Sequence, residues 1–194
     1  LNFDSNGGTE IDAVTAKVGT AIEAPSNPEK LGHRFLGWEP EVPTEMPEGH
    51  TTCVAQWEAL ESTVTFDTNG GSSIDSITQL IGSSLIHPGN PTREGHTFAG
   101  WDPELPDTMP AADTTYTAQW TVNQYTLTFY DDDQLLAKIT QDFGTLVEAP
   151  GDPEKEGHSF VGWGAAVPAT MPAEDMDFTA RWSVNQYTIT FNSD

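Results

Sequence analysis

Short segments in which apolar and polar residues alternate recur along the chain. One set alternates apolar residues with threonine at 63–66, 125–129 and 187–191, and a second places alanine and tryptophan on one side at 53–57, 116–120 and 178–182. A period of two residues is typical of a strand with one buried face. The pattern therefore predicts a mainly β protein whose strands recur at regular intervals.

A seven-residue pattern, G-H-x-F-x-G-W, sets the interval. It occupies residues 32–38, 95–101 and 157–163, so that its tryptophans, Trp38, Trp101 and Trp163, are 63 and 62 residues apart. A fixed period of this kind indicates tandem repeats. We expect modules at residues 1–58, 64–120 and 125–182, followed by the first strand of a fourth repeat at 184–194. Because the sequence opens inside the first strand of one repeat and closes just after the equivalent strand of a fourth, we expect the natural protein to continue beyond both ends.

The residues after each first strand predict its turn and its partner. Asn-Gly-Gly at 6–8 and 69–71 predicts tight turns, because these residues accept positive φ. The third repeat has Asp131–Asp133 instead, so we expect a different turn there. The apolar spacing that follows, at residues 11, 14 and 18 in the first repeat, fits either a strand or one helix face, and β-branched residues favour a strand.

Proline and glycine predict the remaining connections. Prolines at 25 and 28, and their equivalents at 88 and 91 and at 150 and 153, indicate a crossover with a single helical turn around Glu29-Lys30-Leu31. Gly32, Gly95 and Gly157 suit a left-handed residue that closes this turn, and the glycine before each patterned tryptophan is typical of a β-bulge or of a close backbone approach. The linkers are short, as in Val122-Asn123-Gln124, so neighbouring modules should be constrained in orientation.

Acidic residues are spread evenly over the modules. The chain has 30 Asp and Glu against 7 Lys and Arg, for a formal net charge of −23. Without a basic patch it would be repelled by a phosphate backbone or an anionic membrane, so nucleic acid is not an expected partner. No apolar run approaches the length of a membrane span and no signal peptide is present. We expect a monomer with no membrane insertion within these residues.

The single cysteine and the repeated histidines are weak candidates for chemistry. Cys53 occupies the position of Tyr116 and Phe178, which indicates an apolar inward-facing residue, and no base repeats beside it to activate a thiol. The equivalent histidines lie in separate modules with no second ligand beside them, so a partly buried or turn-capping histidine is favoured over a metal ligand; these histidines are His33, His96 and His158.

Two further candidates concern ions and sugars. Asp131–Asp133 offers hard oxygen ligands for calcium, but it lacks the spacing of a D-x-D-x-D-G loop and occurs once. A solvated turn is favoured there, and whether it binds an ion stays open. The six tryptophans would suit a glycan platform, yet their strand register indicates core packing. Since no hydrolase, zinc or phosphate-loop motif occurs, we predict no catalytic, cofactor-binding or metal-binding residue, no cofactor and no enzyme activity.

The combined order of motifs resembles one known family. Thr65 to Gly71 (T-F-D-T-N-G-G), a Pro-x-x-Pro loop, Glu94 to Trp101 (E-G-H-T-F-A-G-W) and Tyr116 to Trp120 (Y-T-A-Q-W) resemble the Listeria–Bacteroides repeat, the B repeat of internalin-type surface proteins. The resemblance implies an α+β, mainly β fold of small β-grasp-like, ubiquitin-like modules. It also implies extracellular proteins anchored to the bacterial cell wall or exported, without established catalytic residues.

These observations together predict a structural role. We expect an extended array that acts as a stalk or spacer in a bacterial cell-surface protein and projects an adhesive domain, since like charges and short linkers both extend an array. The alternative is that the repeats themselves bind a host protein or glycan, for example by strand addition at a sheet edge.

Overall fold

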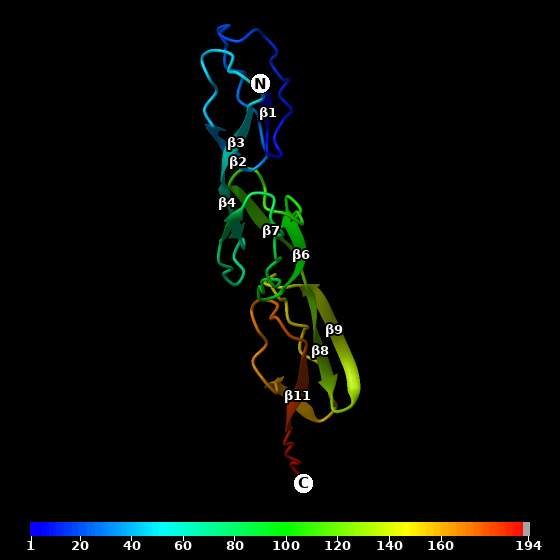
Figure 1. Ribbon diagram of the computed structural model, residues 1–194. Helices are drawn as coiled ribbons and strands as arrows, with labels where there is room; N and C mark the ends of the chain where they lie inside the picture. Colours follow the sequence, from blue (N-terminus) through cyan, green and yellow to red (C-terminus); the bar gives the residue numbers. More distant parts are fainter. Residues whose placement is uncertain (192–194) are drawn as a thin grey trace. The chain divides into compact units, whose positions relative to one another are not determined.

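The regular structure of the protein is entirely β in the part of the chain that is described. The computed structural model describes residues 1–191, drawn in Figure 1 as strands and connecting loops. The predicted α+β class is therefore wrong, because residues 1–191 contain no helix, and Lys30 to His33 form a hydrogen-bonded turn in place of the expected helical turn at Glu29-Lys30-Leu31. Only three residues separate Pro28 from Gly32, whose φ of 69° ends the segment, and so short a run does not repay the cost of nucleating a helix. The helix-on-sheet packing of a β-grasp module is accordingly not found.

The strands form three sheets. The first sheet has the order β1-β3-β2, the second β5-β4-β7-β6 and the third β10-β11-β8-β9. In each sheet the first strand of the repeat pairs in parallel with the last. The bounds are β1 (Asn2–Asp4), β2 (His33–Glu39), β3 (Thr52–Ala59), β4 (Glu61–Asp67), β5 (Ile77–Leu80), β6 (His96–Asp102), β7 (Thr114–Val122), β8 (Gln124–Asp131), β9 (Gln134–Asp142), β10 (His158–Trp163) and β11 (Met176–Val184).

The alternating segments confirm the strand predictions. β4 buries Val64 and Phe66 and exposes Thr65, while β7 buries Tyr116 and Ala118. Each G-H-x-F-x-G-W stretch also forms a strand, as predicted. The register of β2 shifts between Phe35 and Gly37, and β10 shifts at the same place, so the predicted bulge is confirmed in these two strands. One face of each sheet is therefore available to form a core.

The second strand differs between the repeats. The preference for a strand is confirmed by β5 and β9, but residues 11–18 of the first repeat form none. There the equivalent pairing is limited to Leu1 and Val14, whose backbone groups exchange two hydrogen bonds of 2.9 Å. β9 is long because Asp131 pairs directly with Gln134. The third repeat thus closes a two-residue hairpin where the others use Asn-Gly-Gly, which confirms that its turn is built differently.

The Asn-Gly-Gly turns need all three residues. Asn6 and Gly7 have φ of 48° and 84°, and Asn69 and Gly70 have nearly the same values, 47° and 85°. Gly8 is required for a different reason, since a Cβ on it would lie 2.6 Å from Cζ2 of Trp57 and 3.0 Å from a backbone oxygen. The turn is therefore shaped by the indole ring that packs on it as well as by backbone preference.

Each repeat has its own core, closed by a buried methionine. The methionine amide N–H donates to the carbonyl of Thr20, Ser83 or Thr145, and its carbonyl accepts from Gly19, Gly82 or Gly144, at 2.8 to 3.0 Å. The Met-Pro segment is thereby hydrogen-bonded to the segment that contains Gly19, Gly82 or Gly144, a role that the sequence alone did not assign. The buried clusters are Leu1, Met46 and Cys53; Val64, Phe66, Leu85, Met109 and Tyr116; and Leu127, Phe129, Met171 and Phe178.

The described residues divide into two compact units whose borders differ from those of the repeats. The first comprises Leu1–Asn69, Ser73–Gly89 and Trp101–Ala118, and the second comprises Gly70–Ser72, Asn90–Gly100 and Gln119 onward. Leu60 and its neighbours lie inside the first unit, and Asn123 and its neighbours lie inside the second. Each of these two linkers therefore belongs to one compact unit.

The strand expected at the start of a fourth repeat is not formed. β11 ends at Val184, and residues 185–191 have no regular structure. The side chains of Tyr187, Ile189 and Phe191 are exposed. Residues 192–194, the remainder of that predicted segment, lie outside the described residues.

Candidate functional site at the repeat junctions

Adjacent repeats are joined through a single residue, which we call the junction residue. Leu60 stands between β3 and β4, and Asn123 stands between β7 and β8. The N–H of Leu60 donates to the carbonyl of Gly32 at 2.8 Å, and its carbonyl accepts from the N–H of Ile81 at 2.9 Å. Asn123 repeats this arrangement with Gly95 and Phe143, at 2.9 Å in both bonds. Each junction residue is thus held from the repeat before it and from the repeat after it.

An apolar side chain from the following repeat completes each junction. This corner residue is Ile81 or Phe143 and directly precedes Gly82 or Gly144. A Cβ on Gly32 would lie 2.9 Å from Cβ of Ile81, and a Cβ on Gly95 would lie 2.1 Å from Cγ of Phe143. Glycine is therefore required at both positions for close approach, in addition to the left-handed φ of 69° and 66° that the sequence predicted.

The repeated histidines cap the turn beside these glycines. Nδ1 of His33, His96 and His158 lies 2.7 to 2.8 Å from the carbonyl oxygen two residues earlier in each case. The predicted turn-capping role is therefore confirmed. The ring of His96 also stands edge-on to Phe143, with centroids 5.9 Å apart. We call the glycine, the histidine and the junction residue together the socket.

Asparagine strengthens the junction where it replaces leucine. Oδ1 of Asn123 accepts from the hydroxyl of Thr97 at 2.6 Å, and its Nδ2 lies 3.4 Å from the hydroxyl of Tyr125. Asn185 makes the same contacts with Ser159 and Tyr187, at 2.6 and 3.4 Å. The recurring Val-Asn-Gln-Tyr sequence is the signal for this side-chain network, which joins β6 or β10, the G-H-x-F-x-G-W strand of one repeat, to the segment that follows the junction residue.

A cation at one position of each repeat holds the first turn, and sequence reasoning missed it. Nζ of Lys30 donates to the carbonyl of Asn6 at 2.9 Å and lies 5.7 Å from the ring centroid of Trp57. Nζ of Lys155 lies 5.5 Å from the ring of Trp182, and Arg93 takes the same position in the second repeat. The negative face of an indole ring attracts a cation placed over it. The signal in the sequence was the regular spacing of three of its seven basic residues.

In the third repeat the acidic turn replaces a backbone acceptor by a carboxylate. Oδ1 of Asp131 accepts from the indole N–H of Trp182 at 2.8 Å and from Nζ of Lys155 at 3.1 Å. The Trp182 hydrogen bond, together with Lys155, holds the pKa of Asp131 below its ordinary value, and the pKa of Lys155 is correspondingly raised, chiefly by its hydrogen bond to Asp131. This carboxylate is thus engaged in the fold of the turn.

The lowered pKa of Asp131 predicts an acid-sensitive third repeat. Because the folded state binds the proton more weakly than the unfolded state, Asp131 stabilises the fold above its unfolded pKa of about 3.9. That contribution is lost as the pH falls through the folded-state pKa. The free energy of unfolding of the natural chain and of Asp131→Asn is measured by urea titration of the Trp182 indole N–H resonance. We expect the difference between the two chains to shrink between neutral pH and about pH 3.

The matched control for this titration is Asp133→Asn, since Asp133 lies in the same turn with an exposed side chain. A difference between the natural chain and Asp131→Asn that stays constant from neutral to acid pH would show that the carboxylate charge does not hold the turn.

Cys53 and the tryptophans are structural in this fold. Cys53 is fully buried in the core of the first repeat, as predicted, and burial raises the pKa of its thiol. Trp38, Trp101 and Trp163 are half-buried and pack on the core phenylalanine of their own repeat, with centroids 4.9 to 5.2 Å apart. These three rings therefore contribute to the cores, as their register indicated.

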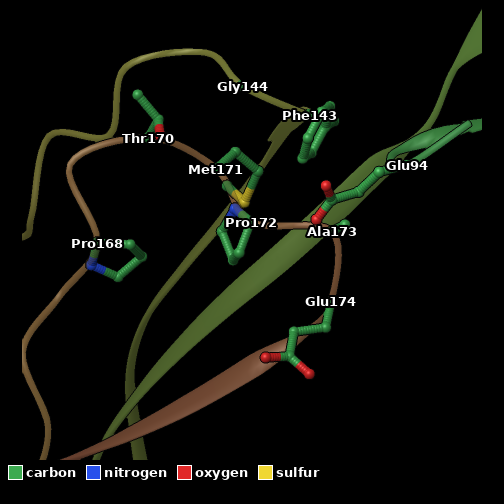
Figure 2. A pocket seen from close by; sticks show the side chains of 9 residues that line it. All are labelled: Glu94, Phe143, Gly144, Pro168, Thr170, Met171, Pro172, Ala173 and Glu174. Atoms are coloured by element: carbon green, nitrogen blue, oxygen red, sulfur yellow. The ribbon is translucent and has the colours of Figure 1, made fainter. Parts of the chain in front are cut away.

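A hollow of about 510 Å³ lies beside the corner residue Phe143 in the second unit (Figure 2). Figure 2 shows Phe143 on one side of the hollow and the carboxylates of Glu94 and Glu174 on others, around Met171 and Pro172. Its ionisable lining residues are both acidic, so an anion would be repelled. The described residues contain no group of three or more His, Cys, Asp or Glu side chains placed to hold a metal ion.

The described residues thus make a tandem array of small β modules, each with its own core. Each module is joined to the next through one junction residue, whose backbone is hydrogen-bonded to both repeats. Comparison with known families agrees with this class. A profile of the Listeria-Bacteroides repeat domain matches residues 1–48, 63–122 and 125–184. The chain belongs to the Listeria-Bacteroides repeat family, which confirms the resemblance seen in its motifs.

Similar proteins carry this region as one part of a longer chain. Two are proteins of Evansella cellulosilytica whose names describe a Gly-rich membrane protein and a membrane protein; they are 37% and 33% identical over 98% and 99% of this chain. Internalin H of Listeria monocytogenes is 39% identical over 52% of this chain. The matched region covers 25%, 33% and 20% of the length of these relatives. Within residues 1–191 no helix is long and apolar enough to cross a membrane.

Proposed function

We propose that these repeats are a non-catalytic spacer of a bacterial cell-surface protein and hold a functional domain of that protein at a distance from the envelope. The observation that carries the proposal is the one-residue junction with hydrogen bonds on both sides, since a linker with so little freedom transmits orientation from one repeat to the next. The net charge of −23 adds repulsion between neighbours. The relationship to internalin H and to proteins named as membrane proteins supports a surface location.

Small-angle X-ray scattering at moderate salt tests the spacer role. A compact globule of 194 residues should have a radius of gyration of roughly 16 Å, whereas three modules in line should give roughly 25 Å. We expect the larger value, at a forward scattering that corresponds to a monomer. A value near 16 Å would contradict the proposal, because repeats that pack on one another cannot act as a spacer.

The second candidate is an adhesive role of the repeats themselves, toward a host protein or glycan. It is favoured by exposed apolar side chains at one position of the third strand, where Leu36 and Val161 are 60% and 61% exposed and the second repeat has Ala99. A panel of immobilised host-matrix proteins and glycans tests it. Binding that is lost in the double variant Leu36→Asp, Val161→Asp would support this role, and no binding above a scrambled control would remove it.

A further inference from the structure

The described residues contain a third socket, and its corner position is open. Gly157 has the same left-handed conformation as the glycines of the two filled sockets, with φ of 72°. Nδ1 of His158 lies 2.8 Å from the carbonyl oxygen of Glu156, and the N–H of Asn185 donates to the carbonyl of Gly157 at 2.8 Å. The half of the junction that one repeat supplies is therefore already assembled.

Residues 1–191 place no corner residue against Gly157. A Cβ on Gly157 would have no heavy atom within 4 Å, in contrast to Gly32 and Gly95, which meet a corner residue. A hollow of about 590 Å³ opens there, with Phe160 and Trp182 among its lining residues. In the filled junctions the carbonyl of the junction residue accepts from the amide of the corner residue, whereas residues 1–191 offer the carbonyl of Asn185 no such donor.

We propose that this third socket is a docking surface for the apolar-glycine corner of a further Listeria-Bacteroides repeat. The corner would place an aliphatic or aromatic side chain against Gly157 and the ring of His158, and donate its amide N–H to the carbonyl of Asn185. The same surface is filled in this way twice in the same chain, by Ile81 and by Phe143. The segment after Asn185 also repeats the sequence that follows Asn123, namely Gln-Tyr-Thr, an apolar residue, Thr and Phe.

The chemistry of the surface favours an uncharged apolar corner. Its glycine leaves room for a side chain, and its aromatic residues offer apolar area. Glu154 and Glu156 at the rim would repel an acidic corner, and Lys155 is engaged with Asp131. The socket therefore selects for an apolar residue followed by glycine, the pair found as Val18-Gly19, Ile81-Gly82 and Phe143-Gly144. This inference does not depend on the spacer role.

The test extends the chain by one further repeat, which supplies a corner residue. A second copy of Gln124–Val184 is placed directly after Asn185, and the amide resonances of Gly157 and His158 are compared with those of the original chain. We expect them to move toward the positions of Gly95 and His96, and the amide of the added Phe143 to exchange about tenfold more slowly than the same position in a variant with Phe143→Ala in the added copy. Leu135→Ala in the added copy, at an exposed site away from the corner, should leave both effects unchanged.

Two results would overturn the proposal. The first is an added repeat that is folded, as reported by the methyl resonance of its buried methionine, while Gly157 and His158 keep their original resonances. The second is a concentration-dependent shift of these resonances in the original chain that disappears in Val18→Asp. Val18 is 63% exposed, so that result would assign the socket to a second copy of this chain instead.

Discussion

Replacing Phe129 by alanine is expected to unfold the third repeat while the first repeat stays folded. The Phe129 side chain is fully buried, stacks on Phe178 with centroids 5.1 Å apart, and contacts the ring of Trp163 at 4.9 Å. Truncation of a buried phenylalanine costs about 3–5 kcal/mol. A module of this size has a total stability of roughly 3–9 kcal/mol, so the loss takes away a third of it at least and can exceed the whole.

The buried methionines report on this experiment one repeat at a time. Met46, Met109 and Met171 each lie in the core of a different repeat. We expect urea titrations of their methyl resonances to show an early transition for Met171 in Phe129→Ala and an unchanged one for Met46. Leu135→Ala is the control, since Leu135 lies in the same repeat with 55% of its side chain exposed, and its effect should stay within about 0.5 kcal/mol. Simultaneous loss of all three signals would show that the repeats do not have separate cores.

The strands and turns could be predicted because their causes are local. Alternation along 63–66 and 116–120 reports one buried face whatever lies against it. A glycine such as Gly157 is needed for its own backbone conformation, which the sequence pattern already indicates. Repetition made these predictions stronger, because a weak pattern that occurs three times at a fixed spacing is better evidence for a strand or turn than the same pattern found once.

The errors arose where a local pattern was given too much weight. The α+β class rested on a resemblance and on the short run Glu29-Lys30-Leu31, which is too short before Gly32 to nucleate a helix. The strand expected at 11–18 has the right residues, but a strand also needs a partner along its length, and only Val14 has one. Whether residues 11–18 form a strand therefore depends on a pairing partner elsewhere in the chain.

The junction was the least predictable feature because its contacts join residues far apart in the sequence. Nothing in Gly95 or Phe143 alone indicates that their atoms are in contact, since the left-handed φ already explains the glycine. The role of Lys155 was missed for a similar reason, as its partners are Asp131 and Trp182. Both features are visible in the sequence only as repeated residue types without an assigned purpose.

The junction contact itself predicts a difference between two chemically identical substitutions. Gly95 and Gly157 occupy equivalent positions with φ of 66° and 72°, so alanine at either site carries the same backbone cost, about 1–2 kcal/mol for a left-handed residue. At Gly157 the new methyl group meets no heavy atom within 4 Å, whereas at Gly95 it would lie 2.1 Å from Phe143. Overpacking of this kind costs a further 1–3 kcal/mol or so.

We therefore expect Gly95→Ala to destabilise the second repeat by about 2–5 kcal/mol, and Gly157→Ala to destabilise the third by about 1–2 kcal/mol. Urea titrations of the methyl resonances of Met109 and Met171 measure the two effects in the same chain. Adding Phe143→Ala should reduce the cost of Gly95→Ala to that of Gly157→Ala, because removing the ring removes the clash, while leaving Gly157→Ala unchanged. If the two glycine variants cost the same in the presence of Phe143, then Phe143 does not fill this junction, and the coupling between repeats must reside in the backbone and side-chain hydrogen bonds of Asn123.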